Sequence, residues 1–489
     1  MVRRDLGRLW AIVLLSSALY GGLARLDAIS GPAPVLRFLG IMGLLFGLYA
    51  AAARIFLRLP DSRAALGVVV AGAFLFRLAL LPAGLPPDLP LSGLRAALAD
   101  DVQGRRVTFE RFQLYDDDVW RYLWDGHVLA HRGSPYGPSP TDPSLDALAE
   151  PEKTAVTDRR TTWADVRDNV NYPQTPTVYP PLAQGLFWLS HRLAPGSLLV
   201  FKLLVVGLDL LAALFIAMAL RAAGRPATEA ALYAWNPLVV KVFAGSGHFD
   251  ALAVALLALL ALCLVKRLPT LAAAAWSAAV LAKLAPLVLL PLLVRRLGLV
   301  RTAGFALVAV AGLRPMLEGS SLAAFAGQWQ FNAGLFHVLK ALAAPFGPEA
   351  DAMARLLSAA VVLAVLALLL RSDDGRPDSM PRVGLVALGA LLLVGPAVMP
   401  WYVTWLLPFA VLSSRREWLA LSGLVCLAFV VMIDGVERPL VLALEHGLML
   451  LVILGGCVDA SIPRALHRAL GAVRPRLRPG LALVGRPVV

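Results

Sequence analysis

Charged residues are scarce in this chain. Only 16% of its 489 residues are Asp, Glu, Lys or Arg, whereas 59% are hydrophobic and the mean hydropathy is +0.73. A soluble domain usually contains about 25% charged and at most about 50% apolar residues. The composition therefore excludes an ordinary soluble domain and predicts a protein that crosses a membrane several times.

Cysteine is rare, and familiar catalytic motifs are missing. The three cysteines, Cys263, Cys426 and Cys457, lie in apolar runs without metal-binding spacing, and their odd number argues against a disulfide framework. There is no P-loop, Rossmann fingerprint, HExxH or GxSxG motif. Nothing in the sequence indicates ATP-driven chemistry, so a reaction would need a substrate that is already activated.

The excess of positive charge, a net +13, is confined to particular places. Arginines concentrate at the start of the chain, in short loops and in the basic tail, 461–489. This is the positive-inside pattern of a membrane protein, and such a tail can also contact anionic lipid headgroups. Membrane lipids are therefore expected partners, and nucleic acid is not.

The apolar runs predict an all-α polytopic membrane protein with about 12–14 transmembrane or re-entrant helices. Two helices lie in 1–60, and the membrane domain covers 61–460. The short stretch 182–194 is expected to be an interfacial or re-entrant helix. The other spans are expected near 9–28, 34–57, 64–84, 197–220, 228–246, 249–265, 299–315, 349–370, 383–399, 401–413, 417–433 and 439–457.

Loop charges orient these helices. Arginines at the start of the chain place it in the cytoplasm, so the long segment 85–181, with 15 acids against 10 basic residues, lies outside. A second outer loop covers 316–348. If the apolar run from Thr270 were one helix, Arg295 and Arg296 would lie outside. A break near Lys283 returns them to the cytoplasm and leaves both termini there.

A cluster of charged and aromatic side chains lies at one place in the first outer segment: Asp116, Asp117, Asp118, Arg121, Trp124 and Asp125. Neighbouring acids bind protons or ions more readily, so the cluster indicates a general base or an ion site. In a helix, Arg121 would lie three or four positions from three of these acids and could pair with any of them. The alternative is a solvated helix start, where acids are favourable.

Three later motifs add candidates at the same predicted face. Tyr179 belongs to TVYPP, where prolines fix an extended entry into the membrane and the aromatic ring can stack on a sugar. His248 and Asp250 lie in GSGHFDAL, although a helix cap is an alternative for this turn. Trp401 and Tyr402 lie in VMPWYVTWLLP and fit an aromatic belt equally well.

Lys283 lies inside an apolar run. An intramembrane lysine is costly, which makes it a functional candidate. Its natural partner is a lipid phosphate. The alternative is a snorkelling side chain whose charge reaches the interface.

Taken in order, these residues resemble the GT-C superfamily of glycosyltransferases. The stretch YDDDVWRYLWDGHVLAHRGSPYGPSP is similar to the first outer loop of bacterial polyprenyl-phosphate-mannose-dependent mannosyltransferases and of glycosyltransferase family 87. That loop carries an acidic pair, RYxWDG and GxNPY, and Ser134 here replaces the usual Asn. TVYPPLAQ, GHFDAL, AKLAPLVLLP, WQFNAG and PWY resemble later landmarks, so the likeness spans residues 65–410.

The resemblance implies an inverting enzyme whose active site lies at the non-cytoplasmic face. It would move a hexose, with mannose favoured, from a polyprenyl-phosphate donor to a glycolipid or glycan acceptor. Asp117 is then the base that deprotonates the acceptor hydroxyl, with Asp118 as the second choice. Some relatives use a divalent metal and others do not, so no cofactor is fixed. The predicted substrate-binding residues are Arg121, Trp124, Asp125, Tyr179, His248, Asp250, Lys283, Trp401 and Tyr402.

Two other classes of function are open. A lipid-linked sugar flippase or transporter needs polar groups along its whole path, whereas the candidates here cluster at one face. A structural subunit without catalysis needs neither the acidic pair nor Lys283. The sequence therefore favours an enzyme of the inner (plasma) membrane.

Overall fold

The computed structural model describes residues 2–26, 32–83, 117–150, 162–322, 327 and 329–472. Within these ranges the chain is helical, and the one β-contact is a single bridge between Phe331 and Ala397. Eight of the described helices are long and apolar enough to cross a membrane, and three shorter apolar helices accompany them. The predicted all-α polytopic membrane fold is confirmed.

Three helices begin the chain: α1 (Val2–Leu23), α2 (Pro32–Phe56) and α3 (Arg63–Leu80). The helix α2 is tied to the rest of the bundle, because the Tyr49 hydroxyl donates to the Leu232 carbonyl at 2.7 Å. The ring of Phe38 packs edge-on against Phe429 at 5.0 Å. The first two helices are thus joined to the bundle. Their status as an addition to a GT-C core stays a prediction.

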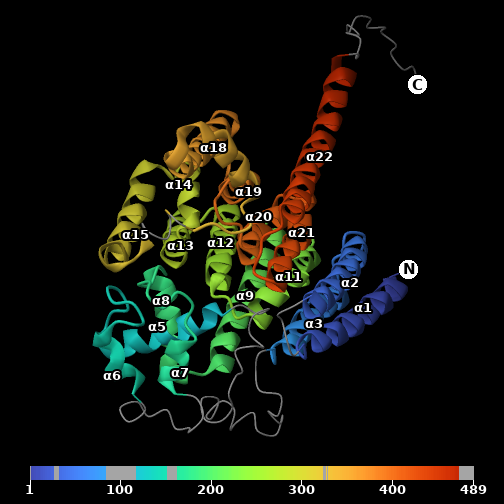
Figure 1. Cartoon of the computed structure of the whole chain (residues 1–489). Helices are drawn as coiled ribbons and strands as arrows, with labels where there is room; N and C mark the ends of the chain where they lie inside the picture. Colours follow the sequence, from blue (N-terminus) through green and yellow to red (C-terminus); the bar gives the residue numbers. More distant parts are fainter. Residues whose placement is uncertain are drawn as a thin grey trace, which may run out of the picture.

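The described part of the first outer segment forms α5 (Asp118–Arg132), η4 (Pro143–Leu145), α6 (Asp146–Ala149) and α7 (Trp163–Asp168), followed by α8 (Pro181–Leu193). These helices gather at one end of the molecule (Figure 1). The predicted short helix after residue 181 is present, and its position in a membrane stays a prediction. Asp116 lies outside the described residues.

The central helices α9 (Leu198–Ala222) and α12 (Asp250–Val265) flank a broken segment. One helix was predicted near 228–246, but four short pieces form instead: η5 (Ala227–Ala230), α10 (Ala231–Ala234), α11 (Pro237–Val240) and η6 (Lys241–Gly245). Pro237 lacks an N–H, and the Asn236 side chain accepts from the Leu238 N–H at 3.0 Å, which starts a new helix there.

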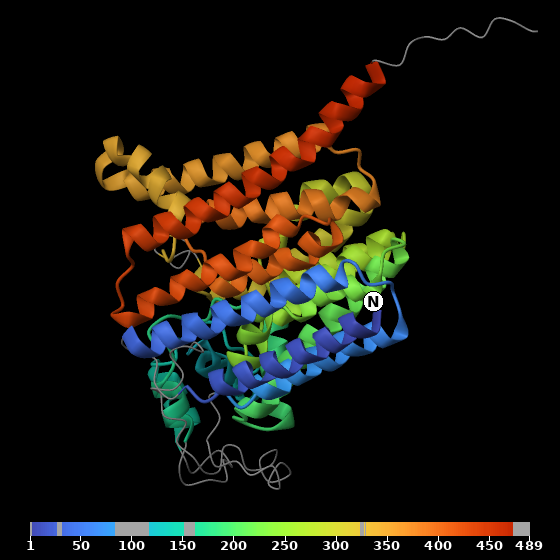
Figure 2. The same cartoon turned by 90° about the vertical axis from the view of Figure 1, so that its right-hand side faces the viewer.

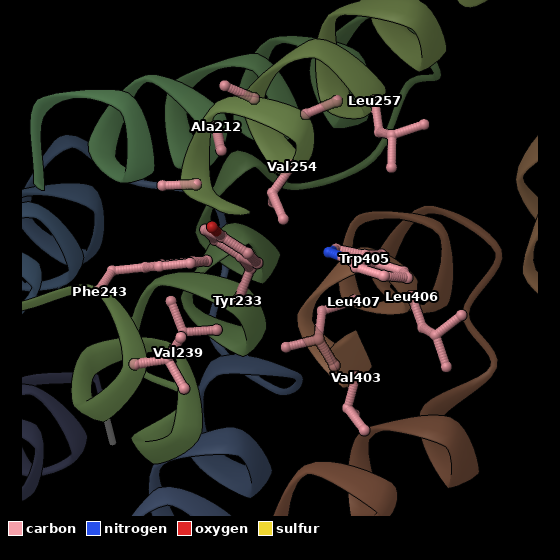
Figure 3. Packing of buried hydrophobic residues seen from close by; sticks show 14 of the residues in the cluster. Ala212, Tyr233, Val239, Phe243, Val254, Leu257, Val403, Trp405, Leu406 and Leu407 are labelled. Carbon is pink, nitrogen blue, oxygen red and sulfur yellow. The ribbon is translucent and has the colours of Figure 1, made fainter. Parts of the chain in front are cut away.

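Buried apolar side chains from these pieces form the core. In Figure 3, Phe243 and Val239 face residues of α9 and α12 such as Ala212 and Val254, and Leu407 approaches from the C-terminal part of the chain. All five are fully buried. This packing fixes the turn between η6 and α12, where His248 and Asp250 lie.

The chain breaks where the sequence predicted it. The helix α13 (Pro269–Ala282) ends directly before Lys283, whose backbone is extended with φ −156° and ψ 137°. After the break come η7 (Ala285–Leu289), α14 (Leu290–Leu297) and α15 (Leu299–Gly319). The Trp276 indole N–H donates to the Pro286 carbonyl at 2.8 Å and holds the two sides of the break together.

The C-terminal part contains three long helices and many short ones. The long helices are α18 (Ala350–Ser372), α19 (Met380–Leu393) and α22 (Pro439–Ala472). The short ones are α17 (Gly334–Leu342), η8 (Ala344–Glu349), η9 (Pro377–Ser379), η10 (Pro400–Leu406), α20 (Leu407–Leu412), η11 (Arg416–Ala420), α21 (Leu421–Leu424) and η12 (Val425–Ile433). The predicted loop 316–348 therefore contains helix.

The two ends of the described chain point the same way. In Figure 2 the start of α1, in dark blue, and the end of α22, in red, lie toward one end of the bundle. The teal helices α5 and α8 lie toward the other end. The fold thus separates α5 and α8 from the two ends of the described chain along the bundle.

Candidate active site

A cavity of about 780 Å³ opens where the start of α5, the extended segment before α8, the break after α13 and the start of η10 meet. Seven of the predicted site residues line it: Asp117, Asp118, Arg121, Tyr179, Lys283, Trp401 and Tyr402. Four do not: Trp124, Asp125, His248 and Asp250. Residues far apart in the sequence are thus brought to one site.

Asp117 and Asp118 lie at the N-terminal end of α5, where the helix dipole favours negative charge. Asp117 occupies the N-cap position, but its side chain makes no capping hydrogen bond. Instead, the amide Nδ2 of Asn171 lies 3.0 Å from Asp117 Oδ1 and 2.7 Å from Asp118 Oδ1. The two carboxylates are therefore held side by side at the cavity wall rather than used to cap the helix.

Asp118 is connected to a buried histidine through a tyrosine. The hydroxyl of Tyr122 lies 3.3 Å from Asp118 Oδ2 and 3.3 Å from Nδ1 of His248. The His248 ring stacks on Trp401 with centroids 3.9 Å apart and the planes 22° apart. His248 therefore supports Trp401 and Asp118 from behind, while Trp401 faces the cavity. The predicted contact of His248 with the substrate stays a prediction.

Arg121 and Asp125 form a buried ion pair one helical turn apart, with Nε 2.9 Å from Oδ1. Arg121 Nη2 also donates to the Thr175 carbonyl. The other oxygen of Asp125 accepts from the Thr177 hydroxyl at 2.6 Å and from Gln184 Nε2 at 2.9 Å. Asp125 therefore joins α5, the extended segment and α8. These contacts fit a positioning role, and its predicted substrate contact is untested.

The packing of α5 on α8 depends on a glycine. A Cβ placed on Gly126 would lie 2.4 Å from the backbone oxygen of Phe187, which is an impossible contact. Trp124 beside it is buried under the guanidinium of Arg167, whose carbon lies 6.0 Å from the ring centroid. The WDG triplet thus serves close helix packing, and the substrate contact predicted for Trp124 is untested.

Lys283 projects into the cavity from the break after α13 and is paired there. Its Nζ lies 3.1 Å from Asp250 Oδ1, which also accepts from the indole N–H of Trp405 at 2.8 Å. The rings of Phe249, Tyr402 and Trp405 lie 4.6, 5.0 and 5.5 Å from Nζ. Asp250 is fully buried, whereas the Lys283 side chain is 16% exposed. The ammonium keeps donors for a further anion, because an ammonium has three.

Aromatic residues form part of the cavity wall, namely Tyr179, Trp401, Tyr402 and Trp405. Tyr179 is held by the hydroxyl of Tyr136, which donates to the Tyr179 carbonyl at 2.9 Å. Tyr402 stacks face to face on Trp405 with centroids 4.3 Å apart, so each ring supports the other next to Lys283. Exposed aromatic faces of this kind stack on sugars and attract cations. An aromatic part of the wall therefore shares one cavity with the carboxylate pair.

Carboxylates are suitable ligands for a divalent cation, which makes the acidic pair a candidate metal site. Two Asp side chains at a cavity wall provide oxygen donors of the kind that Mg²⁺ and Mn²⁺ prefer. The amide nitrogen of Asn171, however, faces both carboxylates. A cation there would require the amide to turn its oxygen inward. The residues fit a hydrogen-bonded pair better than a metal site.

Sequence reasoning missed three residues of the site. Asn171 bridges the acids, Trp405 supports Asp250, and Trp329 lines the cavity with its ring 4.9 Å from that of Tyr172. Tyr172 has a positive φ of 49°, which marks a strained turn directly after Asn171. The tyrosine-proline pair after Asn171 was the available signal in the sequence.

Comparison with protein families agrees with this geometry. The alpha-(1->6)-mannopyranosyltransferase N-terminal domain matches residues 112–298, and the MptB C-terminal domain matches residues 331–454. The chain belongs to the alpha-(1->6)-mannopyranosyltransferase family. The resemblance to GT-C mannosyltransferases is thereby confirmed, and the chain is a membrane glycosyltransferase of the mannosyltransferase type. Neither curated proteins nor solved structures provide a match.

The match covers both sides of the cavity. The N-terminal domain match includes the acidic pair, Asn171 and Lys283, and the C-terminal domain match includes Trp401 and Tyr402. The helices α1, α2 and α3 precede the matched region. The mannosyltransferase family therefore shares the part of the chain that forms the site.

Proposed function

We propose that this mannosyltransferase transfers mannose from a polyprenyl-phosphate donor to a glycan or glycolipid acceptor, with inversion at the anomeric carbon. One observation carries the proposal: a single cavity holds a carboxylate pair, a lysine ammonium and an aromatic wall. These are the three elements that the reaction needs, namely a base, a phosphate-binding cation and a sugar-stacking surface.

In the proposed step, the acceptor hydroxyl attacks C1 of mannose while Asp117 or Asp118 takes its proton. The bond between C1 and the phosphate oxygen breaks, and the polyprenyl phosphate leaves with the bonding electron pair. The position of both acids at the helix N-terminus favours the ionised form that a base requires. Asp117 is the first choice by the resemblance, and Asp118, which lies next to Tyr122, is the second.

Lys283 is proposed to bind the donor phosphate. Asp250 and the Trp405 indole fix the ammonium in place, and the neighbouring rings leave it partly accessible to the cavity. Arg121 lines the same cavity but is committed to Asp125 and Thr175. We therefore propose that Arg121 mainly holds α5 in position. Binding of the donor phosphate would be its secondary role.

The polyprenyl chain has an apolar surface available next to the phosphate position. Leu284 and Ala285 follow Lys283, and Ala428, Phe429 and Met432 of η12 line the cavity as well. Apolar side chains of this kind can contact a lipid chain without any polar group being lost from water. The polyprenyl chain of the donor would then extend from the phosphate at Lys283 toward η12.

Charge and arrangement support one orientation in the membrane. The start of α1 and the end of α22 lie toward one end of the bundle, and α5 and α8 toward the other (Figure 2). Arg3, Arg4 and Arg8 at the start favour the cytoplasm for that end. We therefore propose cytoplasmic termini and an active site on the non-cytoplasmic face of the inner membrane.

The family name indicates an α-(1→6) product. An inverting displacement that yields an α-mannoside requires a β-linked donor, so the proposed donor is a β-mannosyl polyprenyl phosphate. The anomeric configuration of the donor and that of the product can therefore be tested together. A retaining enzyme would need the opposite anomer.

The deciding experiment uses the full chain purified in detergent, incubated with radiolabelled polyprenyl-phosphate-mannose and a membrane lipid extract. A labelled lipid or glycan product of new mobility is expected, and its linkage can be read by α-mannosidase digestion. Detergent removes the two compartments that a flippase or transporter would need, so those activities give no product. Failure to form any mannoside with this donor would contradict the proposal.

A further inference from the structure

Three histidines meet between α5 and α8, away from the cavity. His127 and His131 are four residues apart on α5, and His191 lies in the last turn of α8. One possible ligand nitrogen from each ring lies within 4.8 Å of the other two. None of the three lines the cavity of the proposed active site.

Backbone carbonyls fix the orientation of two of these rings. Nε2 of His127 lies 3.0 Å from the Leu148 oxygen, and Nδ1 of His131 lies 2.9 Å from the His127 oxygen. A carbonyl oxygen only accepts, so these nitrogens carry the hydrogens and the opposite nitrogen of each ring presents a lone pair. Metal-binding imidazoles are held in the same way, with the non-ligating N–H on a carbonyl or carboxylate.

Two buried nitrogens of the cluster lack a hydrogen-bond partner within the described residues. They are Nδ1 of His127 and Nδ1 of His191. Buried polar atoms nearly always have a partner, so each of these nitrogens calls for one. Burial lowers the pKa of His127 to about 3 and that of His191 to about 4. Both rings are therefore neutral at pH 7, which is the form that binds metal ions.

Simple aromatic packing explains only part of this arrangement. Trp163 stacks on His127 with centroids 3.7 Å apart and planes 9° apart. Stacking uses the face of an imidazole, whereas its nitrogen lone pair lies in the plane of the ring. The packing therefore leaves the unpartnered Nδ1 of His127 unexplained.

We propose that His127, His131 and His191 bind a zinc ion that fastens α8 to α5. Imidazole nitrogen suits zinc, and two histidines four apart on one helix form a common half of such sites. Three protein ligands leave a fourth tetrahedral position, which water can occupy because His131 is exposed. The ligand nitrogens must approach to within about 3.4 Å of one another around the ion, which the exposed ring of His131 permits.

The test measures zinc in the full-length protein, purified through a tag without histidines and first stripped with a chelator. Titration with zinc should load about one ion per chain, with a rise in the unfolding temperature, and cobalt should give the visible spectrum of a tetrahedral site. His131→Ala and His191→Ala should each weaken zinc binding by more than about 100-fold, since changes outside the ligand set alone cost roughly 10–100-fold.

A matched control exists on another helix. His337 is also exposed, and its Nδ1 lies 2.7 Å from the carbonyl four residues earlier, as for His131. His337→Ala should keep wild-type zinc affinity and the zinc-induced rise in unfolding temperature. Binding that is absent, or equal in His131→Ala, His191→Ala and His337→Ala, would overturn the proposal. Because His131 is exposed, its replacement leaves the protein folded, so loss of zinc there is not a folding defect.

Discussion

The ammonium nitrogen of Lys283 lies 3.1 Å from a carboxylate oxygen of Asp250, which is itself completely buried. The pair spans the break after α13 and the start of α12, so it joins two elements as well as two charges. Removing one partner of such a pair leaves an uncompensated charge buried away from water. The proposed phosphate role of Lys283 must therefore be tested separately from this structural role.

A pair of variants separates the two roles. Lys283→Met should lower the unfolding temperature, because Asp250 loses its counter-charge. Lys283→Met combined with Asp250→Asn should recover most of that stability. Neither variant should bind the donor well, since a charge-assisted contact contributes about 1.5–3 kcal/mol, or roughly 10–150-fold in affinity. Direct binding of labelled donor measures this, and wild-type affinity in the double variant would leave Lys283 with a structural role alone.

The base assignment predicts a loss of rate without a loss of binding. Asp117→Asn keeps the shape of the side chain and removes its basicity, so turnover should fall by about 10²–10⁴-fold while donor affinity stays nearly unchanged. Asp118→Asn is the comparison, and Asp168→Asn, an exposed acid of α7, is the control that should keep full activity. Full turnover in both Asp117→Asn and Asp118→Asn would show that neither acid is the base.

Asp125 is predicted to act through stability. Asp125→Asn removes the charge from a buried pair with three further hydrogen-bonding partners, so it should destabilise the outer segment by about 3–5 kcal/mol. Asp146→Asn removes an exposed pair with Arg167, which should cost at most about 1 kcal/mol. Thermal unfolding in detergent compares the two, and equal effects would contradict the anchoring role.

The contact at Gly126 gives a further test of helix packing. Gly126→Ala would place a methyl carbon 2.4 Å from the Phe187 oxygen, so α5 and α8 must separate and transfer activity should fall with stability. Gly185→Ala on α8 has no neighbour within 4 Å and should be neutral or slightly stabilising, since alanine favours a helix by up to about 1 kcal/mol. An unfolding temperature for Gly126→Ala no lower than that of Gly185→Ala would refute the close packing.

Orientation can be read by cysteine labelling in intact cells. In a chain lacking Cys457, the exposed residue Ser144 replaced by Cys should react with an impermeant maleimide from outside. Ser372→Cys, at the end of α18, should react only after permeabilisation, because the arginines nearby favour the cytoplasm. Labelling in the reverse order would place the site on the cytoplasmic face and remove the basis for a donor on the outer leaflet.

The sequence predicted the features that depend on local composition and on loop charge. Apolar runs gave the membrane fold, and the requirement that Arg295 and Arg296 stay inside predicted the break near Lys283, where α13 does end. The ordered motifs also predicted that the acidic pair, Lys283 and the Trp401–Tyr402 dipeptide lie together, and these residues do line one cavity, while their roles stay predictions. Each of these predictions rests on a local signal, either the composition of one stretch of chain or the charge of one loop.

Features that arise from long-range pairing were not predictable. The partner of Lys283 is Asp250, which the sequence offers only as a separate candidate, and the bridge between the acids comes from Asn171, whose only signal is the tyrosine-proline pair that follows it. The segment 228–246 was predicted as one helix because its apolar run is continuous, but Asn236 and Pro237 interrupt it. Tertiary contacts determined the two pairings, which one sequence does not contain in readable form, whereas the Asn236–Pro237 dipeptide was a local signal for the break.

The amide that spans Asp117 and Asp118 has a consequence for the timing of the reaction. An amide nitrogen can donate one hydrogen to each ionised carboxylate, as it does here. When the carboxyl oxygen that faces the amide has taken the acceptor's proton, that oxygen becomes a donor, and the same amide then presents the wrong atom to it. A half-turn of the Asn171 side chain would offer its oxygen instead. The orientation of the Asn171 amide would thus depend on whether a facing oxygen of the pair holds a proton, and the arrangement seen here is the one that suits two ionised acids.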